Sequence, residues 1–295
     1  MLGRAKIACL GGDARSLSMM RRLAVLGADV RAFGLPESDA NADWSVATSL
    51  EDVLEGSRAV ILPMPAFDQN GTLYFPLREG TANVTANDLF SRIGGRMPVF
   101  GGRISPSVVS LAEQNGVTLI DYSKIDELQI RNAVPTAEGA ICLAMQALDV
   151  TLDGARVAVL GYGRIGAALS ERLCALGAHV TVAARKTRDV ARIQCAHCRA
   201  IHLVGEESLT PLTVGYDVIF NTIPYRLLTP RILEAMPKKT LLMELASAPG
   251  GWDADATIPC RTIYAPGLPG KYAPRSAGVI VADTLLPLLE EVIKV

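Results

Sequence analysis

The sequence predicts an α/β protein with two domains, each built around a parallel sheet, and three observations lead to it. Short apolar strand segments alternate with helical segments along the whole chain, a pattern typical of parallel sheets covered by helices. The segments 4–33 and 155–184 share one order: strand, glycine turn, helix ending in Leu-Gly-Ala, second strand. The 295 residues suit about two domains. We therefore expect two Rossmann-like domains whose sheets flank a cleft.

The expected elements follow in order. In the first domain the strands are 6–10, 29–33, 59–62, 97–100 and 118–121, with helices at 15–26 and 107–115. In the second the strands are 156–160, 179–184, 200–203, 217–221, 240–245 and 262–264, with a helix at 164–176.

Domain boundaries follow from a helical stretch in the middle of the chain. Helical spacing of apolar residues predicts a linking helix over 136–149, and Pro135 at its start is tolerated there. A first domain of 1–135 and a second of 150–275 result. The last helix, 276–295, is expected to cross back onto the first domain.

Composition and charge exclude several classes of protein. The chain is 49% hydrophobic and 20% charged, so it is not disordered. A net charge of −1 without a basic stripe gives no support for nucleic-acid binding. No run approaches the roughly 20 apolar residues that span a bilayer. No apolar segment with a cleavage site opens the chain, so we expect a cytoplasmic protein.

A glycine motif follows the strand 156–160 and opens the next helix. Its residues are Gly161-Tyr162-Gly163-Arg164-Ile165-Gly166. In this context the first glycine permits a tight turn, the second lets the backbone approach a pyrophosphate, and the third lets helix and strand pack closely. The phosphates would lie at a helix N-terminus. A glycine-rich turn without a ligand is the alternative.

The second strand of this unit indicates which dinucleotide binds. It ends in Ala184-Arg185-Lys186, whereas NAD proteins place an acid there on the ribose 2′-hydroxyl. Arg185 can stack on adenine or pair with a 2′-phosphate, and Lys186 adds a charge. We therefore expect NADP rather than NAD. A solvated basic loop is the other interpretation.

Two further strand ends are expected to contact the cofactor. One carries Asn221-Thr222-Ile223-Pro224 and the other carries Ala246-Ser247. Ligands of open α/β sheets lie beyond the carboxyl ends of the strands, where these residues fall. An ordinary turn is an alternative for each residue.

The first glycine turn, Gly11-Gly12-Asp13, lacks a third glycine at the right spacing. We interpret it as an anion site for the substrate, with Arg15 in the first helical turn. A cation is unfavourable there unless an anion accompanies it. Simple solvent exposure of Arg15 is the alternative.

Cysteines and histidines give weak signals. Cys195-Ala196-His197-Cys198 followed by His202 has some spacing of a zinc site, but a helix end with core-facing thiols explains it as well. We expect no metal. His179, His197 and His202 are expected on the outer part of the second domain, which disfavours alcohol oxidation by a histidine base.

Several motifs spread over nearly the whole chain carry a resemblance. They begin at Lys6, Asn132, Ala246, Ala265 and Ala273, and read KIACLGGDAR, NAVPTAEG, ASAPGG, APGLPG and APRSAG. Together they resemble the A subunit of bacterial dipicolinate synthase, with Ser276 where threonine is expected. The resemblance implies a formate/glycerate-dehydrogenase-like arrangement of a substrate domain and an NADP domain.

The resemblance also implies a reaction and partners. A dihydrodipicolinate from the lysine pathway would be oxidised to pyridine-2,6-dicarboxylate in the mother cell of a sporulating bacterium. A flavoprotein-like B subunit would be the partner, and we also expect a homo-oligomer.

A cyclic dicarboxylate needs cationic and neutral donors. Arg15, Arg103 and Arg275 are the candidates to clamp the carboxylates, and neutral donors are expected from Ser105, Asn132, Thr136 and Ser247. Glu138 is the candidate base; a first-turn helix residue that favours the dipole is the alternative.

Two other functions stay open on the sequence. One is a different NADP-dependent enzyme acting on an amino or imino dicarboxylate. The other is a non-catalytic NADP-binding subunit whose partner performs the chemistry.

Overall fold

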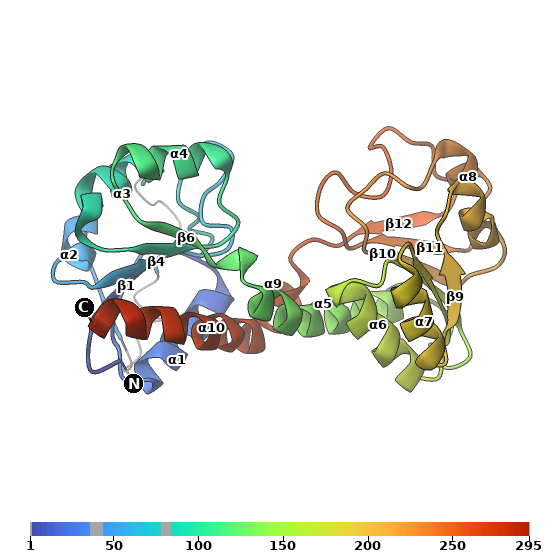
Figure 1. Ribbon diagram of the computed structural model, residues 1–295, viewed down its shortest axis with the longest axis horizontal. Coiled ribbons are helices and arrows are strands. Elements are labelled where there is room, and N and C mark those ends of the chain that lie inside the picture. The colour runs from blue at the N-terminus through green and yellow to red at the C-terminus, as the bar shows by residue number, and fades with distance from the viewer. Residues whose placement is uncertain (1, 36–43, 78–83, 295) are drawn as a thin grey trace. The chain divides into compact units, whose positions relative to one another are not determined.

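The computed structural model describes residues 2–35, 44–77 and 84–294, and the chain divides into two compact units (Figure 1). Unit 1 comprises Met1–Asn132 and Ala273–Val295, and unit 2 comprises Ala133–Tyr272. Each unit holds one six-stranded sheet, and all the strand pairs are parallel. The predicted α/β class with two parallel sheets is therefore confirmed.

The sheet of unit 1 has the strand order β3-β2-β1-β4-β5-β6. Its strands are β1 (Lys6–Leu10), β2 (Asp29–Phe33), β3 (Ser45–Val46), β4 (Ala59–Ile61), β5 (Val99–Gly101) and β6 (Leu119–Asp121). The order reverses between β1 and β4, which is the doubly wound topology that places ligands at the carboxyl ends of the strands.

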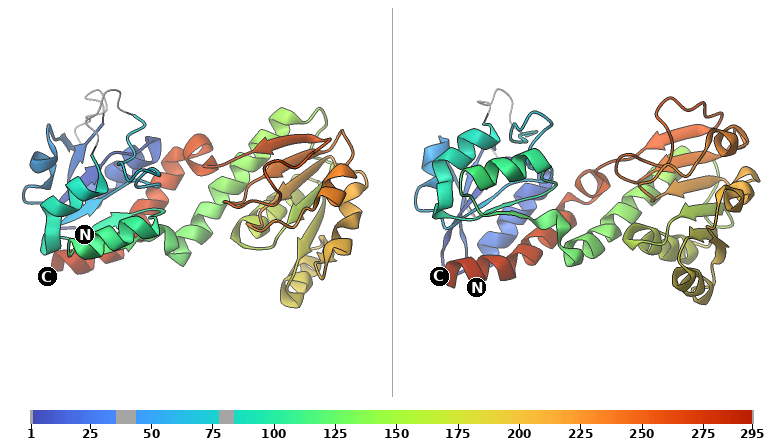
Figure 2. Two further views of the ribbon diagram at one scale, coloured as in Figure 1. Left: turned by 90° about the horizontal axis from the view of Figure 1, so that it is seen from above. Right: turned by 45° about the horizontal axis from the view of Figure 1, so that its top comes forward.

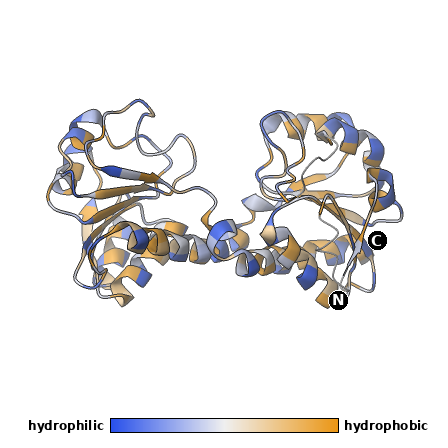
Figure 3. Cartoon of the chain, turned by 180° about the vertical axis from the view of Figure 1, so that it is seen from behind, coloured by the Kyte–Doolittle hydropathy of each residue, from blue (hydrophilic) through white to orange (hydrophobic). Residues whose placement is uncertain are grey.

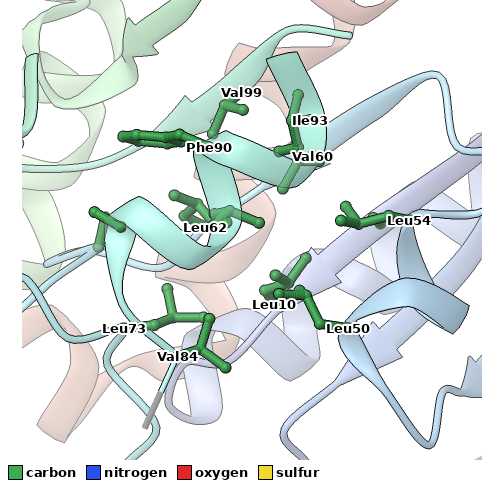
Figure 4. Packing of buried hydrophobic residues seen from close by; sticks show 14 of the residues in the cluster. Leu10, Leu50, Leu54, Val60, Leu62, Leu73, Val84, Phe90, Ile93 and Val99 are labelled. Atoms are coloured by element: carbon green, nitrogen blue, oxygen red, sulfur yellow. The ribbon is translucent and has the colours of Figure 1, made fainter. Parts of the chain in front are cut away.

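Helices cover both faces of this sheet (Figure 2). They are α1 (Ala14–Val25), α2 (Leu50–Leu54), α3 (Ala86–Ile93), η2 (Gly94–Arg96), α4 (Pro106–Gln114), η3 (Tyr122–Lys124) and α10 (Pro274–Lys294). Alternate residues of a strand point to opposite faces. Leu10 thus belongs to one core, together with Phe90 of α3 (Figure 4), while Ile7 belongs to the other, together with residues of α1 and α10.

Helix α10 lies beside α1 and completes unit 1 (Figure 1). A Cβ on Gly278 would overlap the backbone oxygen of Arg15, so only glycine permits this close approach of the two helices. Further along, Arg22 Nε lies 2.7 Å from Asp283 Oδ1. The order of these contacts shows that the helices run parallel, so both begin at the same end of the unit.

Unit 2 repeats the topology, in the order β12-β11-β10-β7-β8-β9. Its strands are β7 (Arg156–Leu160), β8 (His179–Ala184), β9 (Arg199–His202), β10 (Val218–Asn221), β11 (Leu241–Glu244) and β12 (Arg261–Tyr264). The central strands are apolar along most of their length (Figure 3), because helices bury both of their faces.

The helices of unit 2 form two cores with its sheet. They are α5 (Asp126–Ala147), α6 (Arg164–Ala175), α7 (Thr187–Cys195), η4 (Glu206–Thr213), α8 (Pro230–Glu234) and α9 (Leu268–Tyr272). Val157 and Val159 face α5 and α6, whereas Ala158 and Leu160 face η4 and α8.

The long helix α5 differs from the expected linking helix. It begins at Asp126, ten residues before Thr136, so Pro135 lies inside the helix and not at its start. A proline inside a helix removes one backbone hydrogen bond, and this rule led to the wrong helix start. Helix α5 crosses the boundary between the units at Asn132 and Ala133.

Gly139, the last residue of the motif NAVPTAEG, has a packing role in α5. A Cβ there would lie 3.1 Å from atoms of Leu268 and Tyr272, so glycine lets α9 pack directly on α5.

Across 2–35, 44–77 and 84–294, none of the helices combines the length and apolar character needed to cross a membrane.

Candidate functional site

The glycine turn after β7 has the geometry of a phosphate cradle. Gly161 has φ +100°, and a Cβ there would lie 2.6 Å from Thr222 Oγ1. A Cβ on Gly166 would overlap the carbonyl oxygen of Gly161, so this glycine lets α6 approach the turn. Gly163 is the N-cap of α6, with no side-chain cap, and a Cβ on it would meet no atom within 4 Å.

These residues fit a dinucleotide. Open space lies over an exposed glycine at a helix N-terminus, where backbone N–H groups and the helix dipole favour an anion. Arg164 is exposed, whereas Tyr162 and Ile165 are half-buried beside the turn. Burial raises the pKa of the Tyr162 hydroxyl, so this side chain stays neutral near pH 7.

The end of β8 carries two exposed cations. Ala184 is buried, whereas Arg185 and Lys186 are exposed and form no ion pair with any residue that the structure describes. Helix α7 begins at Thr187, so Arg188 belongs to its first turn and pairs with Asp189 at 3.6 Å. A cationic pair therefore occupies the strand end where NAD proteins place an acid.

His202 lies beside this pair. It ends β9, in register with Ala184, and its Nε2 is 3.0 Å from the carbonyl oxygen of Arg185. His202 thus lies on the edge strand of the sheet, as expected for the outer part of the domain, but at the carboxyl end of that strand. His179 lies at the opposite, amino end of β8. Parallel neighbouring strands bring His202 to the carboxyl edge.

The strand end of β10 is only partly as expected. Thr222 Oγ1 donates to the carbonyl oxygen of Leu160 at 2.8 Å and so lies against the glycine turn. Ile223 is half-buried and Pro224 is exposed. Asn221 is fully buried, and its amide is occupied by Ile223 and Glu244. Asn221 is thus a structural residue in this strand end and not a surface that a cofactor can touch.

The end of β11 contains a residue that the sequence interpretation missed. Glu244 is buried with 3% of its surface exposed, and it accepts hydrogen bonds from Asn221, Ala246 and Gly251. An acid at the end of an otherwise apolar strand was the available signal. Beyond it, Ala246 is buried and the Ser247 side chain is exposed.

The first glycine turn, in unit 1, is closed by the chain itself. Gly12 N donates to the carbonyl oxygen of Tyr74 at 3.0 Å, and a Cβ on Gly11 would lie 2.6 Å from that oxygen. A Cβ on Gly34 would overlap the Phe75 ring. The segment that contains Tyr74 and Phe75 therefore occupies the place where a second dinucleotide would need to lie.

Arg15 has an anionic partner within the chain. Its Nε and Nη2 donate to the two carboxylate oxygens of Asp13 at 3.0 and 2.7 Å, and Nη2 also donates to the carbonyl oxygen of Met64. Asp13 caps α1 as well, by accepting from Arg15 N. The unfavourable position of a cation in a first helical turn is thus compensated without a ligand.

The other expected substrate residues are spread over both units. Ser105 caps α4 by accepting from Val108 N. Arg103 is exposed and has φ +56°. Arg275 is exposed in the first turn of α10 and forms no ion pair within the described part of the chain. Asn132 and Thr136 lie on α5, and both are half-buried.

Glu138 does not lie at a strand end. It is in the middle of α5 with 59% of its side chain exposed, and its Oε1 is 3.5 Å from Arg172 Nε of α6. The two side chains line a pocket of about 560 Å³ between these helices, with Ile141, Cys142 and Met145. The interpretation as a first-turn residue is wrong, because α5 begins at Asp126 and Glu138 lies in its middle. The role of a base stays a prediction.

The cysteine motif forms a thiol pair. Cys198 Sγ lies 3.0 Å from Cys174 Sγ, and burial raises the pKa of Cys198 to about 12. Cys195 is exposed at the end of α7. Among the residues placed by the structure, no three His, Cys, Asp or Glu side chains gather as metal ligands.

Two doubly wound sheets, one of which carries an open glycine cradle, define a nicotinamide-dependent oxidoreductase of the dehydrogenase class. Residues 129–249 match the model for the NAD binding domain of D-isomer specific 2-hydroxyacid dehydrogenases, and residues 6–123 match the model for the N-terminal domain of the dipicolinate synthase A subunit. The chain is 34% identical to the A subunit of dipicolinate synthase from Bacillus subtilis, over 99% of its length and 98% of the relative. It belongs to the family of dipicolinate synthase A subunits.

Solved structures agree with this family. The A subunit of dipicolinate synthase from Bacillus halodurans matches with a TM-score of 0.90 and 31% identity over 98% of this chain and 99% of that one. A transhydrogenase from Sinorhizobium meliloti matches with a TM-score of 0.71 and 16% identity, over 97% and 93% of the two chains. At this lower identity the likeness concerns the fold alone.

Proposed function

We propose that this chain is the NADP-dependent subunit of a dipicolinate synthase, which oxidises a dihydrodipicolinate to pyridine-2,6-dicarboxylate. The observation that carries the proposal is the likeness to the A subunit of the Bacillus subtilis synthase over 99% of the chain. The open glycine cradle of unit 2 and the unpaired cations at the end of β8 support it.

The cofactor is NADP in this proposal. Arg185 and Lys186 stand where the 2′-substituent of the adenosine ribose is held in dinucleotide-binding domains. A guanidinium binds a phosphate through two parallel hydrogen bonds, and an ammonium adds a point charge. His202 contributes by holding the carbonyl group of Arg185. The 2′-hydroxyl of NAD carries no charge, so it would form no ion pair with Arg185 and Lys186.

In this proposal the residues of the chain bind the cofactor and orient it. The N–H groups at the start of α6 receive the pyrophosphate, and Thr222, Ala246 and Ser247 border the nicotinamide half. When bound, oxidised NADP would supply the acceptor for a hydride from the ring carbon of the substrate. A proton leaves the same ring, which becomes aromatic, so positioning supplies most of the rate effect and little acid–base catalysis is needed.

The substrate carboxylates are bound by arginine in this proposal. Arg275 is exposed and unpaired among the described residues, which makes it available to a carboxylate. Arg15 begins α1 at the same end of unit 1, but its guanidinium is engaged by Asp13. Ser105, Asn132, Thr136 and Ser247 remain the proposed neutral donors. Glu138, paired with Arg172, is the weakest of the proposed groups.

The family implies the biological setting of the proposal. The partner is the B subunit, flavoprotein-like in fold, and the substrate derives from an intermediate of the lysine pathway. The reaction belongs to the mother cell of a sporulating bacterium, and the chain works as a homo-oligomer.

The experiment combines the purified chain, its B subunit, the lysine-pathway intermediate and either NADP or NAD. We expect formation of the aromatic dicarboxylate, together with reduction of NADP. Absence of the product with both cofactors would refute the proposal. Turnover of other imino dicarboxylates instead would favour a different reductase. Product formation by the isolated B subunit would favour a non-catalytic role.

A further inference from the structure

Glu244 is a buried carboxylate outside the proposed set of cofactor- and substrate-binding residues. It ends β11 with 3% of its surface exposed, and no cation among the described residues pairs with it. All its partners are neutral donors. Oε1 accepts from Asn221 Nδ2 at 2.9 Å and from Ala246 N at 2.8 Å, while Oε2 accepts from Asn221 Nδ2 at 3.0 Å and from Gly251 N at 2.7 Å.

Asn221 is the counterpart of this carboxylate on the neighbouring strand. It ends β10, directly in register with Glu244, and it is fully buried. Its Nδ2 also donates to the carbonyl oxygen of Ile223 at 3.0 Å, and its Oδ1 accepts from Ile223 N at 3.1 Å. Both side chains are thus saturated by the protein, so neither can act by touching a ligand.

The pair holds the loop that follows β11. Gly251 packs so closely that a Cβ on it would overlap Asn221 Nδ2. Its carbonyl oxygen accepts from Leu228 N at 2.9 Å, which ties the loop after β11 to the loop after β10. Further out, Arg226 of one loop forms an ion pair with Asp253 of the other. Side-chain packing, a backbone hydrogen bond and an ion pair therefore connect the two loops.

The position of these loops gives the pair a function. The glycine cradle follows β7, the adenosine ribose belongs at the end of β8, and the strand order reverses between β7 and β10. The nicotinamide half of a dinucleotide therefore extends over β10 and β11. We infer that Glu244 is a positioning residue whose carboxylate, through Asn221, Ala246 and Gly251, holds the 246–251 loop against the nicotinamide half of the cofactor. This inference rests on the proposed dinucleotide function.

A carboxylate suits this task better than an apolar residue of similar size. Burial of an unpaired charge is unfavourable, so stability alone would favour leucine or methionine at this place. Only a carboxylate accepts from two backbone N–H groups and a side-chain amide together. The exchange of stability for a fixed loop is typical of residues that preorganise a site.

The test separates the two halves of the cofactor. Calorimetric titrations with NADP and with adenosine 2′,5′-bisphosphate are made on the wild type and on Glu244→Gln. Glutamine has the size of glutamate but places an NH2 group against a backbone N–H donor, so it loses at least one of the loop contacts. We expect NADP to bind about tenfold more weakly, as loss of one charge-assisted hydrogen bond implies. The bisphosphate should bind with unchanged affinity.

Thr240→Val is the matched control. Thr240 is fully buried directly before β11, at the end opposite to Glu244, and donates to the carbonyl oxygen of Tyr216 at 2.7 Å. Valine removes one buried hydrogen bond beside the same strand, at the end away from the loop. This variant should bind both probes as the wild type does. Gly251→Ala, which displaces the loop directly, should reproduce the selective loss even where Glu244→Gln fails to fold.

The outcomes separate this inference from the proposed function. Wild-type affinity of both Glu244→Gln and Gly251→Ala for NADP would overturn the inference, as would an equal weakening of both probes. If the wild type prefers NAD, the NADP assignment fails, and the same comparison with NAD and adenosine diphosphate still decides the role of Glu244. A wild type that binds neither dinucleotide would overturn both.

Discussion

The guanidinium of Arg15 and the carboxylate of Asp13 form a two-pronged ion pair at the start of α1, with Nη2 2.7 Å from Oδ2. Both side chains are largely buried, at 15% and 25% exposure. The pair also reaches the carbonyl oxygen of Met64, beyond the end of β4. Arg15 is therefore part of the framework of unit 1, whatever contact it makes with a substrate.

This relationship predicts different effects for two arginines. Arg15→Ala removes the donor of the Met64 carbonyl and leaves Asp13 with only the backbone N–H of residue 15, so we expect the free energy of unfolding to fall by about 1–3 kcal/mol. Arg275→Ala removes an exposed, unpaired side chain and should change stability by less than about 0.5 kcal/mol. It should instead raise the KM for the dicarboxylate about tenfold or more.

Urea unfolding followed by Trp44 fluorescence in a Trp252→Phe background measures the stability of unit 1. Steady-state kinetics with the B subunit measure the KM. An Arg15→Ala variant of wild-type stability would show that the pair with Asp13 contributes little. A normal KM in Arg275→Ala would remove this residue from the proposed substrate site.

Two glycines of the cradle should respond differently to alanine. A Cβ on Gly163 meets no atom within 4 Å, and the backbone there has φ −81°, which any residue adopts. Gly163→Ala should therefore fold normally but fill the space of the pyrophosphate and weaken dinucleotide binding by at least about tenfold. Gly166→Ala overlaps the carbonyl group of Gly161, so it should lose about 1–3 kcal/mol of stability as well.

Thermal unfolding and calorimetric titration of the same two variants check this prediction. Full dinucleotide affinity in Gly163→Ala would mean that no phosphate lies at the start of α6. If Gly163→Ala unfolds as readily as Gly166→Ala, its weaker dinucleotide binding would result from a disturbed fold and not from a filled pyrophosphate site.

The fold was predictable because its signals are local. Apart from β3, the strands of both sheets begin and end within two residues of their expected bounds, since buried apolar runs between glycine turns identify them. Helix α3 was missed although Thr85 and Asp88 form a capping box at its start, a signal that the sequence carries. The two-residue strand β3 is too short to have a pattern. Pro135 argued against a helix that tertiary packing nevertheless extends through it.

The site was predictable only where the chemistry is carried by one short segment. Gly161, Gly163 and Gly166 have backbone roles that follow from their spacing. Asp13 two residues before Arg15 is a local N-cap signal that would have identified the partner of the arginine. The role of Glu244 depends on Asn221, 23 residues earlier, and on the fold that brings β10 and β11 into register. No spacing rule shows such a pair.

Arg185 should decide between the two cofactors. Its side chain is exposed and has no ionic partner in the parts of the chain that the structure places, so its removal should leave stability unchanged. If it pairs with the 2′-phosphate, Arg185→Ala weakens NADP binding by about 1.5–3 kcal/mol, which is roughly a 10- to 100-fold loss, and leaves NAD binding as it was. Lys186→Ala should have a smaller effect in the same direction.

Titration of each variant with both dinucleotides measures this change in selectivity. Arg192→Ala, an exposed cation of the same helix region, is the control and should alter neither affinity. Equal losses for NADP and NAD would place Arg185 on the adenine ring rather than on the phosphate.

Glu244 makes the stability of unit 2 depend on pH. Burial raises the pKa of its carboxyl, and hydrogen bonds from Gly251, Asn221 and Ala246 oppose that rise only in part. The folded chain therefore binds this proton more tightly than the unfolded chain, whose glutamate has a pKa of about 4.3. The contribution of the group to stability is greatest below that unfolded value, falls as the pH rises through the raised folded pKa, and is constant above it. In Glu244→Gln this fall should disappear.

Urea unfolding from pH 4 upwards, followed by Trp252 fluorescence in a Trp44→Phe background, would compare how the stabilities of the wild type and the variant change with pH. Parallel curves for the wild type and the variant would show that the pKa of Glu244 is the same in the folded and the unfolded chain.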